Sequence, residues 1–292
     1  KKKDKHNFFK DNKFSKNLQY EDKDLLENSK EPVIFLYVEH TSLFNRTTGV
    51  QQVTKKMAAY LQGLGYQLIL IKLCFENLEF KTLNELELQS FLNDSDFPAD
   101  LFKLISNSRF NKIINNNKNK NKWLIIPEVT YHSFHTIPPT NRLIKLARNL
   151  KLKIGFIFYD LIPFLKSELS ANKLKHANYL SNISQADVIW PISNYSGNLL
   201  KDYLLEYEEL KLEEFPHIDI IPLPDEMESL RKIKDDSSIF NKILCVGTID
   251  ERKNQYSLVQ AFNEFCILNP DTKYTLTFIG MIREDYKIIF ES

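Results

Sequence analysis

The sequence contains few cysteines and few glycines for its length. Its 292 residues include three cysteines, Cys74, Cys245 and Cys266, and no two of them have the CxxC spacing of zinc and redox sites. Their odd number and wide spacing predict no disulfide framework, as is typical of a reducing compartment. The seven glycines form no GxGxxG motif after an apolar run, which argues against a nicotinamide-dependent oxidoreductase of the Rossmann type.

Long apolar runs and a net charge are also missing. No run approaches the length of about 18 apolar residues that a membrane span needs, and the N-terminus lacks the apolar region of a signal peptide. A net charge of +1 disfavours a nucleic-acid partner. Residues 1–31 are polar and Lys-rich, and we interpret them as a leader; the alternative is a basic surface for anionic lipid. The expected location is therefore the cytoplasm, with peripheral contact to the inner face of the membrane as the alternative.

Short apolar runs alternate with segments of helical periodicity along most of the chain. The expected strands are Val33–Val38, Gln67–Leu73, Trp123–Pro127, Ile154–Tyr159, Ala186–Ser193 and Ile218–Ile221. This alternation predicts the α/β fold class with a mainly parallel sheet. The length favours two domains, which we place at 32–223 and 242–292, after a polar leader (1–31) and on either side of a charged linker (224–241).

The stretch from Ile243 to Gly280 predicts a strand, a loop, a helix and a second strand. Ile243–Val246 is expected to be a buried parallel strand, and Asn254 is the expected N-cap of the helix. Arg252 and Lys253 lie in the loop where that helix begins. Two cations beside a helix N-terminus suit a diphosphate, although solvated loop charges would give the same pattern.

Polar residues follow several expected strands, where sites form in open α/β sheets. Gly49 begins a helix, Glu128 and Asp160 come directly after strands, and Ser193 precedes another helix. Three of them have a structural alternative: an ordinary turn at Gly49, a turn cap at Asp160 and an N-cap at Ser193.

Two further segments carry little functional signal. His132 and His135 are interpreted as loop histidines, because no third ligand accompanies them, so no metal site is expected. The Asn- and Lys-rich segment 111–122 is expected to be an exposed loop.

Several of these segments together resemble the family 4 retaining glycosyltransferases, which have the GT-B architecture of two Rossmann-like domains facing across a cleft. Residues 247–254 (GTIDERKN), followed by the helix with Ala261 and Phe262, resemble the opening of the family's donor domain. The segment 48–53 (TGVQQV) is similar to its T-G-I-Q-R-V loop. Residues 159–163 (YDLIP) resemble its H-D-L-I-P turn, and 186–193 (ADVIWPIS) resemble its A-D-x-I-x-x-x-S strand.

The resemblance implies a role for each matching position. Catalysis would involve Tyr159 and Asp160, the donor would be bound by Gly49, Gly247, Thr248, Arg252 and Lys253, and the acceptor would be bound by Ser193 and Asn194. The implied reaction is transfer of a hexosyl group, with mannosyl as the family's suggestion, from a nucleotide-sugar to a saccharide or glycolipid acceptor. It would proceed with retention and without a metal or other cofactor.

The chain also departs from the family pattern. Tyr159 replaces a histidine, Gln52 and Thr248 replace arginines of some members, and Glu251 replaces a proline. The family's Glu-x7-Glu motif is absent from the donor-domain part and is expected beyond Ser292, so we expect this chain alone to be inactive. A non-catalytic, glycosyltransferase-like binding domain is the alternative.

Overall fold

The computed structural model describes residues 32–43, 48–93, 101–116, 121–130, 139–166, 171–223, 241–271, 273–283 and 287. The leader 1–31, the linker segment 224–240, His132, His135 and Glu168 lie outside the described residues. The chain divides into two compact units, unit 1 (Lys1–Pro224) and unit 2 (Asp225–Ser292), which are considered one at a time.

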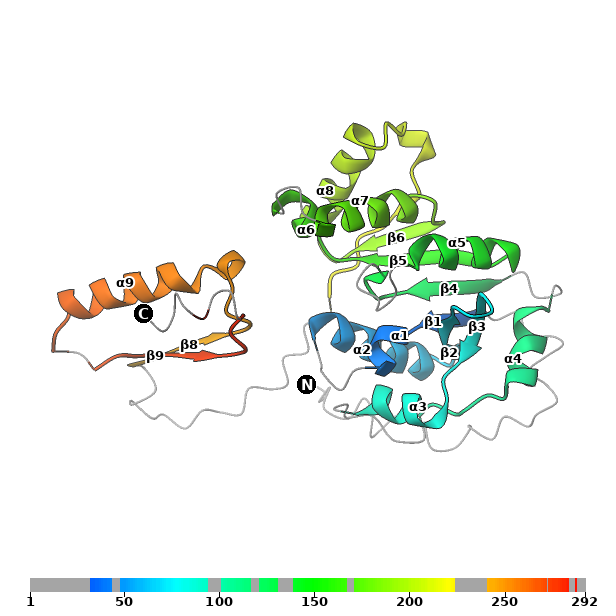
Figure 1. Cartoon of the computed structure of the whole chain (residues 1–292), viewed down its shortest axis with the longest axis horizontal. Helices are drawn as coiled ribbons and strands as arrows, with labels where there is room; N and C mark the ends of the chain where they lie inside the picture. The colour runs from blue at the N-terminus through cyan, green and yellow to red at the C-terminus, as the bar shows by residue number, and fades with distance from the viewer. Residues whose placement is uncertain are drawn as a thin grey trace, which may run out of the picture. The chain divides into compact units, whose positions relative to one another are not determined.

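Unit 1 is built on a seven-stranded sheet with the order β3-β2-β1-β4-β5-β6-β7 (Figure 1). Its strands are β1 (Val33–Tyr37), β2 (Gln67–Cys74), β3 (Glu79–Thr82), β4 (Lys122–Ile126), β5 (Lys153–Phe158), β6 (Val188–Pro191) and β7 (His217–Ile218). All neighbouring strands are parallel except the antiparallel pair β2 and β3. The α/β class expected from the sequence is therefore confirmed.

The sheet is covered on both faces. All five residues of β1 are buried. Since successive side chains of a strand point to opposite faces of the sheet, this burial means that both faces are covered at β1. Phe35 packs into a core cluster with residues of α4, α5, α7 and α8, whereas Leu36 packs into a second cluster with residues of α2 and α3. The helices of unit 1 are α1 (Glu39–Leu43), α2 (Gly49–Gly63), α3 (Glu85–Leu92), α4 (Asn107–Ile114), α5 (Thr140–Asn149), α6 (Ile162–Lys166), α7 (Ala171–Ile183), α8 (Asn194–Glu206) and the 3-10 helix η3 (Leu212–Glu214).

The strand order changes direction at β1. The chain runs from β1 outward to β2 and β3, then returns to place β4 on the other side of β1. The crevice at the carboxyl ends of β1 and β4 is thus the topological switch point, where open α/β sheets bind their ligands.

The expectation of an exposed loop at 111–122 is wrong for its described residues, 111–116 and 121–122. Ile113 and Ile114 end α4 and are buried, and Lys122 begins β4 with only 2% of its surface exposed. The Lys122 ammonium donates to the carbonyl of Ile114. The apolar pair packs against the core and outweighs the polar composition around it.

Unit 2 contains β8 (Lys242–Val246), the 3-10 helix η5 (Glu251–Lys253), α9 (Gln255–Leu268) and β9 (Thr275–Ile279), and its two strands are parallel. The strand-helix-strand order agrees with the sequence, but the expected burial of β8 does not. Leu244 is 59% exposed and Val246 is 67% exposed, because one helix and two strands are too few to cover the sheet.

Asn254 is the N-cap residue of α9, as expected, but it does not cap the helix through its side chain. Its backbone is left-handed, with a φ of 55°, and its side chain makes no capping hydrogen bond. Its Oδ1 accepts instead from the Ser257 hydroxyl at 2.8 Å.

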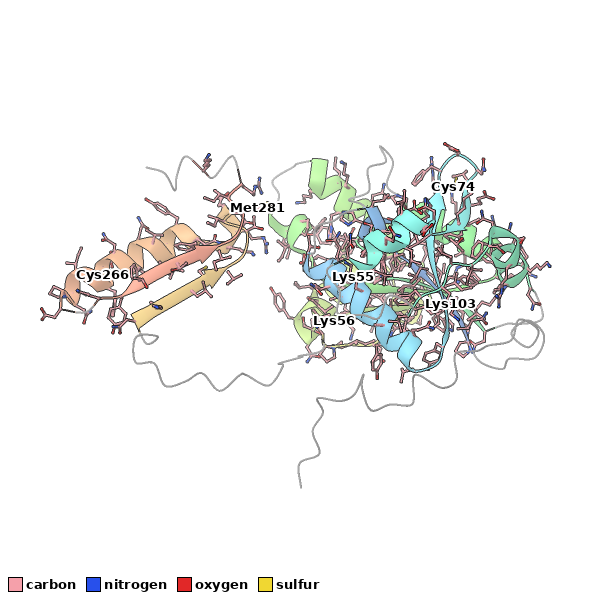
Figure 2. All side chains as sticks on the ribbon, turned by 90° about the horizontal axis from the view of Figure 1, so that it is seen from below. Lys55, Lys56, Cys74, Lys103, Cys266 and Met281 are labelled. Atoms are coloured by element: carbon pink, nitrogen blue, oxygen red, sulfur yellow. The ribbon has the colours of Figure 1, made fainter. Side chains whose placement is uncertain are left out.

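The three cysteines are free thiols. Cys74 belongs to unit 1 and Cys266 to unit 2 (Figure 2). Among the described residues, none of the helices combines the length and the apolar character that crossing a bilayer would require.

Gly155, in the middle of β5, leaves room for an aromatic ring of the next strand. A Cβ at this position would lie 2.3 Å from Cζ3 of Trp190. We expect Gly155→Ala to lower the free energy of unfolding of unit 1 by about 1–3 kcal/mol, because overpacking displaces a well-packed ring. The sequence has two tryptophans, Trp123 and Trp190, and both lie in unit 1, so tryptophan fluorescence during urea unfolding follows this unit alone.

The matched control for this prediction is Gly197→Ala in α8. A Cβ at Gly197 would lie 3.5 Å from Ile220 and Pro191, an ordinary contact, and alanine favours a helix. Equal unfolding midpoints for the two variants would show that the Trp190 ring does not need the space over Gly155.

Candidate functional site

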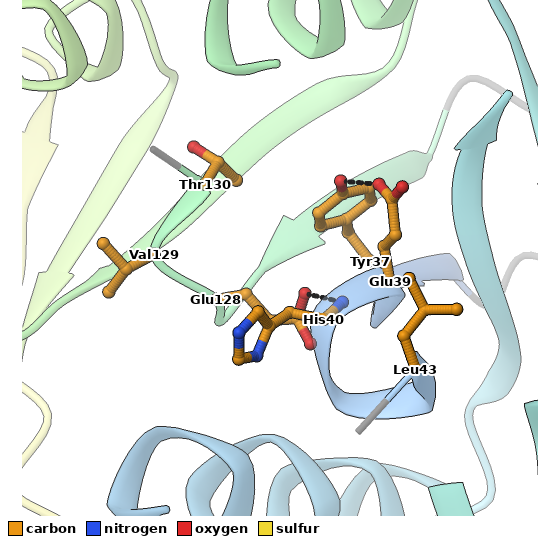
Figure 3. A pocket seen from close by; sticks show the side chains of 7 residues that line it. All are labelled: Tyr37, Glu39, His40, Leu43, Glu128, Val129 and Thr130. Carbon is orange, nitrogen blue, oxygen red and sulfur yellow. Dashed lines mark hydrogen bonds between the residues drawn. The ribbon is translucent and has the colours of Figure 1, made fainter. Parts of the chain in front are cut away.

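A small pocket lies at the switch point of unit 1 (Figure 3). It is lined by Tyr37, Glu39, His40, Leu43, Glu128, Val129 and Thr130. These residues come from the end of β1, from α1 and from the segment after β4, which are adjacent because β1 pairs with β4.

The side chain at the centre of this arrangement is Glu128, which is 2% exposed. Its carboxylate accepts hydrogen bonds from the backbone N–H of His40 at 2.8 Å and of Thr41 at 2.7 Å, and from the Thr41 hydroxyl. The first N–H groups of a helix have no partner within the helix and attract anions. Glu128 therefore fills, from within the protein, the position that a phosphate takes at many switch points.

Burial controls the ionisation of the pocket residues. It raises the pKa of Glu128 to about 7, although the bonds from Thr41 and His40 favour the charged form. Burial lowers the pKa of His40, against the opposing effect of Glu39, so this imidazole is neutral at pH 7. The Tyr37 hydroxyl donates to Glu39, and burial followed by the charge of Glu39 raises the pKa of Tyr37.

Gln51 connects this pocket to the Thr48–Gly49 segment. Its Oε1 accepts from the backbone N–H of Thr48 at 2.8 Å, and its Nε2 lies 3.5 Å from Nδ1 of His40. Among the described residues outside its own helix, no atom would lie within 4 Å of a Cβ at Gly49, so packing against them does not require glycine there. The open space would allow a ligand to approach the backbone closely, and the donor-binding role of Gly49 stays a prediction.

Tyr159 and Asp160 follow β5 and both make structural contacts. The Tyr159 hydroxyl donates to the carbonyl of Pro127 at 2.8 Å, and burial, followed by the charge of Glu128, raises its pKa. Asp160 accepts from the backbone N–H of Ile162 at 3.0 Å, the turn-capping contact weighed as its alternative. Tyr159 thus borders the Glu128 pocket, while the catalytic role of both residues stays a prediction.

Ser193 is the N-cap of α8, since its hydroxyl accepts from the backbone N–H of Ser196 at 3.1 Å. The Ser196 hydroxyl donates in turn to the carbonyl of Tyr159 at 2.7 Å. These bonds bring Tyr159 and Ser193 together at the carboxyl edge of the sheet. Asn194 begins α8 and is exposed. Acceptor binding by Ser193 and Asn194 stays a prediction.

Four of the five predicted donor residues, all except Gly49, belong to unit 2 and follow β8. Gly247 has a φ of 137°, and a Cβ there would lie 2.5 Å from Nζ of Lys253. Gly280, at the end of β9, has a φ of 155°, and its Cβ would lie 2.0 Å from the carbonyl oxygen of Gly247. Glycine suits both positions because of the backbone angle, and at Gly280 it is also needed for the close approach to the Gly247 backbone. The Lys253 ammonium therefore lies over a bare backbone.

Arg252 and Lys253 belong to the 3-10 turn η5, which Asp250 caps. The Asp250 carboxylate accepts from the backbone N–H of Lys253 at 3.0 Å and lies 3.9 Å from Nη2 of Arg252. The Arg252 side chain is 46% exposed, so this ion pair is worth little and leaves the guanidinium accessible to another anion. Thr248 contributes its carbonyl oxygen to a bond from Gln255 at 2.9 Å.

The sequence did not identify His40, Thr41 or Ser196. The segment with His40 and Thr41 has the composition of a loop, and only the pairing of β1 with β4 brings it to Glu128. The position of Glu128 directly after an apolar strand was a usable signal. Ser196 follows Ser193 by one helical turn, which is the spacing of an N-cap contact. No cluster of three or more metal-ligating side chains occurs within the described parts of the chain.

No protein-family model matches the sequence, and no curated protein matches it significantly. Among solved structures, the chain is similar to the crystal structure of an α,α-trehalose-phosphate synthase (UDP-forming) from Burkholderia vietnamiensis. The identity is 11%, the match covers 89% of this chain and 68% of that chain, and the TM-score is 0.42. A likeness this distant assigns neither a family nor an activity.

The raised pKa of Glu128 predicts a pH dependence of stability. Its pKa is about 7 in the fold, whereas an unperturbed glutamate has a pKa of 4.5, so the folded state holds a proton that the unfolded state releases between these values. The stabilisation is complete below about pH 4.5 and is lost as the pH rises through 7. We expect Glu128 to lower the free energy of unfolding of unit 1 by on the order of 2–3 kcal/mol over this range.

Urea unfolding at pH 5 and pH 8, followed by tryptophan fluorescence, tests this prediction. Glu128→Gln should remove the Glu128 contribution, so that the variant loses less stability than the wild type between the two pH values. The control, Glu85→Gln at an exposed position in the first turn of α3, should behave like the wild type. An unchanged pH dependence in Glu128→Gln would mean that this carboxyl does not titrate in the range.

Proposed function

We propose that this chain is a glycosyltransferase that moves a hexosyl group from a nucleotide-sugar to a saccharide or lipid-linked acceptor. The observation that carries the proposal is the loop after β8, in which Arg252 and Lys253 lie in the turn before a 14-residue helix and the Lys253 ammonium lies over the backbone of Gly247. The residues of this loop resemble the family 4 donor loop, and from this resemblance we infer that the ligand is the diphosphate of a nucleotide-sugar.

The chemistry follows from the charge of the leaving group. When the bond from the sugar to the diphosphate breaks, negative charge develops on the diphosphate oxygens. Fixed cations and helix N–H groups stabilise such charge, as a metal ion does in other transferases. In the proposed mechanism Arg252 and Lys253 supply this stabilisation, so transfer needs no metal or other cofactor. Transfer with retention, and mannose as the sugar, rest on the resemblance alone.

The switch point of unit 1 supports the assignment of the diphosphate to unit 2. There the first N–H groups of α1 are already bound to Glu128. A phosphate at that place would compete with a buried carboxylate, and like charges repel at close range. The unit 1 crevice therefore suits a hydroxyl-bearing acceptor better than a phosphate.

In this scheme the acceptor meets the carboxyl edge of the unit 1 sheet. Ser193 and Asn194 would bind it, and Gly49 would allow the donor or the acceptor to approach closely. Asp160 would orient the reacting hydroxyl. Tyr159 would act by hydrogen bonding, because a phenol with a raised pKa cannot accept or donate a proton readily near pH 7. We place the reaction in the cytoplasm, with peripheral contact to the inner membrane face when the acceptor is a lipid.

A binding-only relative is the second candidate. It is favoured by Tyr159, whose hydroxyl is engaged with Pro127, and by Asp160, whose carboxylate caps a turn. This candidate binds nucleoside diphosphates but transfers no sugar. Because this chain alone is expected to be inactive, the assay uses the protein as its source organism expresses it. Proton NMR of that protein with nucleotide-sugars and simple glycosides distinguishes the two candidates, since a transferase forms a new anomeric signal of the donor's configuration.

The proposal predicts that both loop cations contribute to diphosphate binding. We expect Arg252→Ala and Lys253→Ala each to raise the Kd for a nucleoside diphosphate and for inorganic pyrophosphate about tenfold, since a hydrogen bond to a charged group contributes about 1.5 kcal/mol or more. Isothermal titration calorimetry at about 0.1 M salt, with uridine, guanosine and adenosine diphosphates, measures the change.

Lys242→Ala is the matched control for the loss of charge. Lys242 begins β8, at the end of the strand remote from the loop, and it is exposed. It should leave the Kd unchanged. Equal affinities of the Lys242, Arg252 and Lys253 variants, or no binding by the wild type, would refute the diphosphate site.

A further inference from the structure

Gln255 is buried in a part of the molecule that is otherwise exposed. Among the described residues of unit 2, only Gln255 and Ile249 are buried, with 2% and 4% of their surfaces exposed. Apolar residues of the same helix, such as Leu258 and Phe265, are 37% and 39% exposed. The most buried polar side chain among the described residues of unit 2 is therefore a neutral amide. It belongs to the first residue of α9, two positions after Lys253 of the cationic loop.

The Gln255 amide uses both of its ends on the loop backbone. Its Nε2 donates to the carbonyl of Thr248 at 2.9 Å, and its Oε1 accepts from the backbone N–H of Asp250 at 3.3 Å. These two contacts span the residue between them, Ile249. Burying an amide without partners is unfavourable, so the loop conformation that satisfies both ends is strongly preferred.

The backbone that Gln255 holds is the part of the loop that leads into η5. Ile249 is fixed on its other side, where its N–H donates to the carbonyl of Met281 at 2.8 Å. Asp250, held by Gln255, caps the turn in which Arg252 and Lys253 lie. The position of the two cations thus depends on Gln255 through one intervening residue.

We propose that Gln255 is a positioning residue, which fixes the Thr248–Asp250 backbone and thereby places Arg252 and Lys253 for the diphosphate of the donor. The proposal rests on the function proposed above for the ligand. The inferred effect of Gln255 on the loop conformation follows from its two hydrogen bonds and does not depend on the ligand. Gln255 is not assigned any contact with the ligand.

Two variants separate the two hydrogen bonds. Gln255→Leu keeps the approximate size and removes both bonds. Gln255→Glu keeps the acceptor for Asp250 but places a carboxylate oxygen against the Thr248 carbonyl. The matched control is Gln260→Leu, at an exposed position of the same helix.

Affinity for inorganic pyrophosphate and uridine diphosphate is the first readout, measured by calorimetry on the 292-residue chain. We expect Gln255→Leu to raise the Kd roughly tenfold, as the loss of a preorganised loop would, and Gln260→Leu to leave it unchanged. For Gln255→Glu, the Kd ratio to the wild type should approach one at pH 5 and grow at pH 8. The protonated carboxyl regains an O–H donor for Thr248, whereas a merely space-filling role would give no such pH profile.

Trypsin provides a second readout that needs no ligand. The enzyme cleaves after Arg252 and Lys253, and local opening of the loop should speed cleavage there roughly tenfold in Gln255→Leu, while cleavage after Lys273 stays constant. Mass spectrometry of the fragments separates the three bonds.

The outcomes distinguish this inference from the proposed function. If the wild type binds diphosphate and Gln255→Leu binds it as tightly as Gln260→Leu does, the positioning role is overturned. If the wild type binds no diphosphate, the proposed function fails, and trypsin decides on the loop. Faster cleavage after Arg252 and Lys253 would then keep Gln255 as the residue that shapes the loop, and unchanged cleavage would overturn that role as well.

Discussion

The Glu128 carboxylate holds the first turn of α1 against the end of β4, and the rest of the carboxyl edge of unit 1 is arranged around this contact. Taking a carboxylate out of water is expensive unless donors replace the water. Two backbone N–H groups and the Thr41 hydroxyl do so here. From the same edge, Tyr159 bonds to Pro127, and Ser196 bonds to Tyr159. The ends of β1, β4 and β5 and the start of α8 are therefore joined by side chains that bond to backbone, which fixes the edge before any ligand arrives.

The loop of unit 2 is shaped by the same kind of contact. Asp250 and Gln255 bond to backbone N–H and C=O groups, and Gly247 and Gly280 let two strand ends approach without side chains between them. In both units neutral or acidic side chains set the backbone, and the groups suited to contact a ligand are left at the surface. The difference lies in the cations. The carboxylate of Glu128 in unit 1 is bound by backbone and hydroxyl donors, whereas the loop of unit 2 carries Arg252 and Lys253 beside its own carboxylate, Asp250.

The sequence predicted the elements better than it predicted their contacts. Six of the seven strands of unit 1 and the strand-helix-strand order of unit 2 follow from apolar periodicity, which is a local property, whereas the edge strand β3 was not predicted. The role of Glu128 does not, because its partners are 87 and 88 residues away and are determined by the pairing of β1 with β4. The exposure of β8 could not be predicted either, since an apolar strand has the same sequence whether or not other elements cover it. Asn254 shows the limit of capping rules. The sequence correctly predicted that Asn254 is the N-cap residue, but it did not predict the left-handed backbone or the missing side-chain cap.

The scarcity of glycine has a consequence for the heat stability of the chain. In the part of the chain that the structure describes, four residues that are not glycine have left-handed backbone angles near +50°, namely Leu78, Lys151, Glu209 and Asn254. An L-residue is strained in this conformation by about 1 kcal/mol, less for asparagine than for a branched side chain such as leucine. Turns that other proteins make with glycine are thus made here under strain, and that strain lowers the melting temperature. An engineer seeking a more thermostable form would begin at these turns and leave both cores unchanged.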